Sequence, residues 1–74
     1  MTQIPLLAPV ALLVDIPEEG LSRGEMGTVV EFLQDGKEEA VLVEFAGDDG
    51  QMYATAEVKP EQVIVLHKGH HAAA

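Results

Sequence analysis

The sequence has no cysteine, so no disulfide can stabilise a chain of only 74 residues. This length allows a single domain. A domain of this size buries about 60% of the surface that its unfolded chain exposes, which keeps its net stability modest. The missing cysteine fits a reducing compartment, although exported proteins without cysteine also exist.

Positive charge is scarce. Four Lys and Arg stand against thirteen Asp and Glu, which gives a formal net charge of −9. Nucleic-acid backbones are polyanions, and binding them requires clustered cations. We therefore expect no binding to nucleic acid or to an anionic membrane surface. A basic protein is the partner that this charge favours, although an acidic surface also serves solubility alone. The cations are scattered singly: Arg23, Lys37, Lys59 and Lys68.

Long hydrophobic runs are absent as well. The apolar stretch over residues 4–14 is too short to span a bilayer. No basic residue precedes it, and Asp15 and Pro17 end it without a small-residue cleavage site. These features predict a soluble cytoplasmic protein.

Groups that carry catalysis are few. Ser22 is the only serine, and many of the carboxylates come as adjacent pairs in predicted turns, where solvated charge is ordinary. An acid–base pair needs a cleft that separates two pKa values, and a domain this small offers little room for one. The sequence predicts no enzyme, no catalytic residue, no cofactor and no small-molecule substrate.

Three histidines near the end of the chain are candidate metal ligands. Around His67, His70 and His71 stand mainly Gly and Ala, and no carboxylate or cysteine completes a ligand set. A loose tail also lacks the second layer of groups that orients metal ligands. We predict no metal site.

The pattern along the chain is that of β-strands. Val41, Val43 and Phe45 alternate with other residues at a period of two, and valine favours strands. Five strands are predicted, over residues 9–15, 27–34, 39–46, 51–58 and 63–66. Residues with a structural role in the turns between them are Gly24, Gly27, Gly36, Gly47, Gly50 and Pro60.

Gly24 and Gly27 form the sharpest local feature. Two glycines three residues apart at the start of a strand predict a sharp turn and a close approach of the chain to its neighbour. A phosphate-binding loop would need further glycines, a following helix and a lysine, which are missing. Pro60 opens one short 3-10 turn over residues 59–62, because proline suits the first helical position.

The order of these elements predicts an all-β, five-stranded SH3-like barrel. Its first loop is long, the next two are tight, and a short 3-10 turn precedes the last strand. A five-stranded OB barrel usually needs a longer chain and a helix between strands three and four, where only residues 47–50 lie. We predict an N-terminal segment over residues 1–8, the barrel over residues 9–66 and a flexible tail over residues 67–74.

The first and last predicted strands are apolar on both faces. These strands are neighbours in an SH3-like barrel, so Leu13, Ile64 and Leu66 would share an outer patch. Either the N-terminal segment covers this patch and completes the core, or the patch meets a partner or a second copy. The residues predicted to fill the interior are Val10, Leu12, Val14, Val63 and Val65.

A second candidate surface is the long first loop. Ile16, Pro17, Leu21 and Met26 are apolar within acidic surroundings, and Tyr53 should point outward from the fourth strand. An apolar groove ringed by acid suits a peptide with basic flanks.

Five short motifs stand out along the chain: PVAL (9–12), DIPEEGL (15–21), RGEMGTVVE (23–31), VEF (43–45) and KPEQ (59–62). Taken together, they resemble a family of small bacterial proteins, the domain of unknown function 4926. The resemblance implies an SH3-like barrel in a stand-alone bacterial protein, and it supplies no activity. The stretch over residues 24–29 also looks like the start of a KOW-type motif, whose proteins often bind RNA or the transcription and translation machinery.

The leading functional prediction is a small protein-binding module, in one version an antidote or immunity-type partner of a basic enzyme. A homo-oligomer joined through the first and fifth strands is the second hypothesis. A KOW-like nucleic-acid-associated module is the third.

Overall fold

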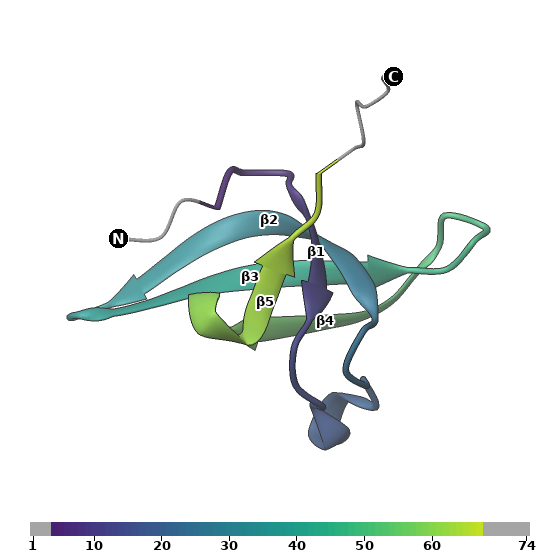
Figure 1. Cartoon of the computed structure of the whole chain (residues 1–74), viewed down its shortest axis with the longest axis horizontal. Helices are drawn as coiled ribbons and strands as arrows, with labels where there is room; N and C mark the ends of the chain where they lie inside the picture. Colours follow the sequence, from purple (N-terminus) through teal and green to yellow (C-terminus); the bar gives the residue numbers. More distant parts are fainter. Residues whose placement is uncertain (1–3, 68–74) are drawn as a thin grey trace.

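The computed structural model describes residues 4–67 as five antiparallel strands with two 3-10 turns (Figure 1). The all-β prediction is confirmed. The first strand ends three residues before the predicted end, and the other four agree with prediction to within one residue. The strands are β1 (Pro9–Leu12), β2 (Met26–Asp35), β3 (Glu38–Ala46), β4 (Met52–Val58) and β5 (Val63–Val65), and the turns are η1 (Pro17–Glu19) and η2 (Pro60–Gln62).

All five strands belong to one sheet with the order β4-β3-β2-β1-β5. β1 pairs with β2 on one side and with β5 on the other, so the predicted neighbourhood of the first and last strands is confirmed. β4 and β5 are the two edges of the sheet. The sheet is therefore not closed, and the predicted closed barrel is not confirmed.

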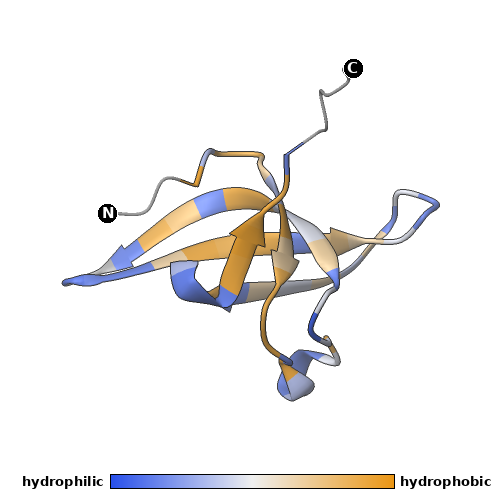
Figure 2. Cartoon of the chain, in the orientation of Figure 1, coloured by the Kyte–Doolittle hydropathy of each residue, from blue (hydrophilic) through white to orange (hydrophobic). Residues whose placement is uncertain are grey.

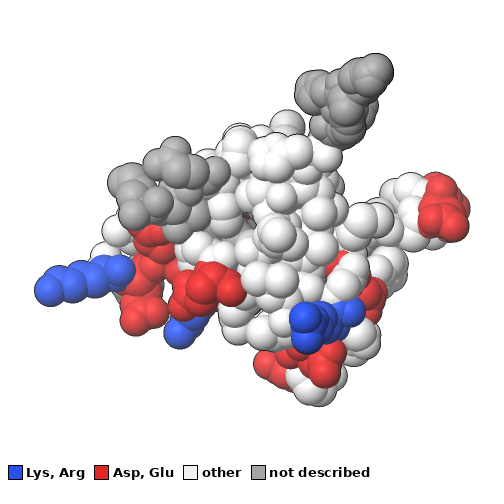
Figure 3. Space-filling model, viewed as in Figure 1, with Lys and Arg blue, Asp and Glu red and all other residues white. Residues whose placement is uncertain are grey.

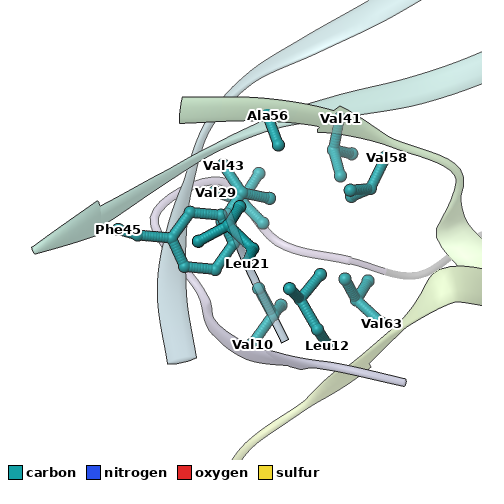
Figure 4. Packing of buried hydrophobic residues seen from close by; sticks show 10 residues of the cluster. All are labelled: Val10, Leu12, Leu21, Val29, Val41, Val43, Phe45, Ala56, Val58 and Val63. Atoms are coloured by element: carbon teal, nitrogen blue, oxygen red, sulfur yellow. The ribbon is translucent and has the colours of Figure 1, made fainter. Parts of the chain in front are cut away.

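The core lies on the inner face of this sheet (Figure 4). All five strands contribute to it, which requires the sheet to curve around one interior. The long loop between β1 and β2 adds one further side chain. The cluster consists of Val10, Leu12, Leu21, Val29, Val41, Val43, Phe45, Ala56, Val58 and Val63. Val65 packs against it as predicted, whereas Val14 lies half-buried outside it, because β1 has already ended at Leu12.

Gly27 is a position in β2 where the neighbouring strand β3 leaves no room for a side chain. A Cβ atom at Gly27 would lie 2.6 Å from Val43 Cγ1 and 2.9 Å from Phe45 Cδ2. No residue with a side chain fits there, so the predicted close approach is confirmed. The predicted turn residues Gly24, Gly36 and Gly50 have positive φ angles of 93°, 64° and 82°. Gly47 accepts the Gly50 N–H at 2.9 Å in the turn between β3 and β4, and Pro60 begins η2.

A β-bulge in β2 changes which side chains face the interior. Val29 pairs with Val43, but Glu31 pairs with Leu42, so Val30 is an extra residue. The shift places Phe32 opposite the buried Val41. Since directly paired residues share a face of the sheet, Phe32 lies on the inner face.

Two backbone hydrogen bonds hold the end of the N-terminal segment beside β2. The Leu7 N–H donates to Val29 O at 2.7 Å, and the Val29 N–H donates to Ala8 O at 3.0 Å. Leu7 has a positive φ of 67°, and this turn directs the preceding residues back across the sheet. Ile4 consequently packs against the core.

Candidate functional site

A row of apolar residues crosses the outer face of three neighbouring strands. Ala11 in β1 pairs with Met26 in β2 and with Ile64 in β5, so the three side chains lie side by side on one face. Met26 is 63% exposed and Ile64 is 51% exposed. Leu13 extends the row along the chain from Ala11 and is 42% exposed.

Backbone hydrogen bonds fix the two ends of this row. The Leu13 N–H donates to Gln62 O at 2.8 Å, and the Leu66 N–H donates to Pro9 O at 2.9 Å. These bonds continue the β1–β5 ladder by one residue at each end. The predicted association of Leu13, Ile64 and Leu66 on one outer surface follows from this register, with Leu66 half-buried. We call the surface formed by Ala11, Leu13, Met26, Ile64 and Leu66 the outer patch.

Met26 and Ala11 are the members of the outer patch that the sequence did not assign to it. The sequence grouped Met26 with the long loop. Its place beside Ala11 depends on the register between β1 and β2, which hydrophobic periodicity does not reveal.

Charge is absent from the outer patch. In Figure 3 the surface over β1 and β5 is uncharged, while acidic side chains, with a few basic ones among them, lie to its left over η2 and the β2–β3 hairpin, below it over η1 and to its right over the β3–β4 turn. Figure 2 shows the same contrast in hydropathy, with β5 hydrophobic along its length and the 3-10 turns and hairpin ends hydrophilic. An apolar centre with a charged rim is the usual layout of a protein interface.

Residues 4–8, the described part of the N-terminal segment, do not bury the outer patch. Its Ile4 packs against the core, and Leu6 and Leu7 remain 52% and 66% exposed. Leu13 and Ile64 stay exposed with this segment in place. Among residues 4–8, the two that complete the core are Ile4 and Ala8.

The long loop contributes less surface than the sequence predicted. Ile16 and Leu21 form a two-residue bridge, with N–H to O distances of 2.8 and 3.0 Å, that folds the loop back on itself. Leu21 is only 2% exposed, so its predicted place on an interaction surface is wrong: the bridge turns this side chain into the core. Ile16 is half-buried against the core, and Pro17 is exposed in η1.

Side-chain hydrogen bonds hold this loop in shape. Asp15 Oδ1 accepts the Arg23 N–H at 2.8 Å, and Glu25 Oε2 accepts the Ser22 N–H at 2.7 Å. The hydroxyl of Tyr53 donates to Glu25 Oε1 at 2.8 Å. Tyr53 is 56% exposed, as predicted, and the hydrogen bond to Glu25 raises the pKa of its phenol above 10.0.

A family model for a domain of unknown function, DUF4926, matches residues 6–65. The chain belongs to this family. The match covers all five strands and the whole outer patch except Leu66. No curated protein and no solved structure matches the chain.

Within residues 4–67, no three His, Asp or Glu side chains are grouped so that they could hold a metal ion. His67 is exposed, and His70 and His71 lie outside the described residues. None of the helical segments in this part of the chain has the length and apolar character needed to cross a membrane.

Proposed function

We propose that this protein is a non-enzymatic protein-binding module that contacts its partner through the outer patch. The observation that carries the proposal is the row Met26–Ala11–Ile64, which is apolar and free of charge across three strands, with Met26 and Ile64 exposed and Ala11 half-buried between them. Strands of a small domain normally bury one face and solvate the other with polar groups. An apolar outer face on β1 and β5 is better explained if a partner protein covers this face.

The partner that we propose is a basic protein. The chain carries a formal net charge of −9, and acidic residues lie on three sides of the uncharged patch in Figure 3. Complementary charge accelerates association and suppresses wrong partners. An antidote or immunity-type protein that occludes a basic enzyme is one concrete form of this function. The fold that we propose for the family is an open SH3-like barrel, supported by the order of its strands and by η2 before β5.

A second candidate is a homodimer joined through β1 and β5. One observation favours it: β5 is an edge of the sheet, and its side chain Ile64 lies in the outer patch beside that edge. An edge strand can pair with its own copy around a two-fold axis. A KOW-like nucleic-acid module is the weakest of the three, because the cations are few and separate.

Affinity capture with matched variants tests the proposal. Immobilised wild-type protein, Ile64→Lys and Thr55→Lys are incubated with extract of the source cells at low salt, and bound proteins are quantified. Thr55 is an exposed residue on the outer face of β4, so Thr55→Lys makes the same chemical change away from the outer patch. We expect a basic protein that wild type and Thr55→Lys retain and Ile64→Lys loses.

The same variants separate a partner from a second copy. Light scattering of the purified protein should give a monomer if the patch meets a different protein. A dimer that Ile64→Lys converts into a monomer would instead establish the second candidate. Equal recovery of the same proteins by all three baits would reject the outer patch as the contact surface.

A further inference from the structure

The hairpin of β2 and β3 continues beyond the core as a two-stranded arm (Figure 1). On the inner face of this arm the bulge in β2 leaves Phe32 54% exposed, directly opposite the buried Val41. An exposed aromatic ring on the core-facing side of a sheet is unusual, because such rings supply much of the apolar area that folding buries.

Phe32 forms one wall of a cavity of about 360 Å³. Val41 lies at its buried side, while Ile4 of the N-terminal segment and Pro60 of η2 complete its apolar lining. This volume accommodates an aliphatic or aromatic side chain. None of the outer patch residues lines it, so it is a separate site.

An adjoining hollow of about 630 Å³ carries the charge of the site. Glu38, Glu39 and Glu57 line it together with a single cation, Lys59. Three carboxylates against one ammonium group favour a cationic ligand, and Glu39 borders both hollows.

Among the strands of residues 4–67, none pairs with the edge of β3 beside these hollows. The pairing of β3 with β4 stops at Val41 and Val58, and the chain then turns away through η2. Residues Glu38 to Ala40 of β3 therefore pair with β2 on one side only. A strand edge of this kind binds extended peptides by backbone hydrogen bonds, while neighbouring pockets select alternate side chains.

We propose that this site binds an extended basic segment of a partner protein. The segment pairs with the free edge of β3 and inserts one apolar side chain between Phe32 and Pro60. A neighbouring lysine or arginine lies against Glu38, Glu39 and Glu57. The apolar cavity supplies affinity, and the carboxylates select the charge.

Titration of the full-length, ¹⁵N-labelled protein with short peptides tests the proposal by NMR. The probe is acetyl-Lys-Thr-Leu-Thr-Lys-amide. One control replaces both lysines with glutamate, and a second replaces the leucine with serine. We expect the probe to shift the amide signals of Leu33, Gln34, Ala40 and Val41 saturably, and each control to bind at least about fivefold more weakly.

Protein variants assign the two parts of the site. Phe32→Ala should weaken the probe at least about fivefold, because it removes one wall of the apolar cavity. Glu39→Gln should reduce the preference for lysine over glutamate peptides, and it provides a test even if Phe32→Ala does not fold. Ile64→Lys should bind the probe like the wild type, because Ile64 lies outside this site. The experiment therefore tests this site independently of the outer patch.

Three results would overturn the proposal. One is the absence of saturable shifts up to about 10 mM probe, a concentration that detects even very weak binding. Another is equal binding of the lysine and glutamate peptides. The third is a set of concentration-dependent shifts at the arm without peptide, which would assign the site to a second copy of the chain.

Discussion

Tyr53, near the start of β4, and Glu25, in the loop before β2, are joined by a 2.8 Å hydrogen bond in which the phenol donates to the carboxylate. Tyr53 is the extra residue of a bulge near the start of β4, since Phe45 pairs with Ala54 and Ala46 pairs with Met52. The other oxygen of Glu25 accepts the Ser22 N–H, so one carboxylate ties the long loop to β4.

Titration of Tyr53 should report this bond directly. The pKa of Tyr53 is raised because its hydroxyl donates to Glu25 and because ionisation would place two negative charges together. Glu25→Gln should therefore lower the pKa of Tyr53 toward 10.0. The measurement is the tyrosinate absorbance against pH, which is specific because the chain has one tyrosine and no tryptophan.

The same hydrogen bond predicts that the stability of the fold decreases slightly at high pH. A group whose pKa is higher in the folded state stabilises the fold below its unfolded pKa and loses that effect as pH rises through the folded value. The wild type should lose this small contribution above pH 10, and Glu25→Gln should not. Glu61→Gln makes the same change of charge on η2 and serves as the control; an equal shift of Tyr53 in that variant would contradict the pairing.

Gly27→Ala should destabilise the protein by about 1–3 kcal/mol, the range seen when an atom is forced into a packed core. The added Cβ overlaps Val43 and Phe45 side chains and lies 2.7 Å from the Glu44 carbonyl oxygen, which cannot move away without disturbing β3. Gly47→Ala is the matched control, because a Cβ there meets only Asp49 Oδ1 at 3.3 Å. Urea unfolding followed by circular dichroism measures the free energy of unfolding of both variants. Similar midpoints would show that β2 and β3 can move apart with little loss of stability.

Leu21→Ala should cost about 2–5 kcal/mol, the range for large-to-small changes in a core. Leu13→Ala, which removes the same atoms from a 42% exposed residue, should change the free energy of unfolding by no more than about 1 kcal/mol. Thermal unfolding of the two variants compares a loop residue in the core with a strand-end residue on the outer patch. A larger loss for Leu13→Ala would place the outer patch inside the fold.

Removing charge beside the outer patch should slow the association with a basic partner. Glu18→Gln combined with Glu19→Gln neutralises η1, and the association rate should fall severalfold at low salt while the dissociation rate changes little. Asp48→Asn with Asp49→Asn removes the same charge from the more distant β3–β4 turn. Surface plasmon resonance on the captured partner measures both pairs, and a larger effect of the second pair would move the contact surface toward that turn.

The sequence was informative about strands and much less about their faces. Alternation in β3 and the turn glycines located the strands, and the apolar character of both faces of β1 and β5 indicated the outer patch. Leu21 escaped prediction because its inward turn depends on the bridge to Ile16, which no periodic pattern marks. Phe32 escaped for a related reason: simple alternation from Val29 would place it outside, and one extra residue in β2 reverses that assignment.

The position of β1 in the sheet has a consequence for how the protein is made. β1 is synthesised first but lies between β2 and β5, and Val10 pairs with Val65 near the other end of the described chain. Val63 is the residue of the core cluster furthest along the chain, so the cluster is incomplete until β5 has been synthesised. Pairing of such distant segments also makes folding slow, since the intervening chain must first be ordered. The nascent protein therefore lacks its complete core until β5 has left the ribosome, and any truncation before β5 leaves β1 without one of its two neighbours.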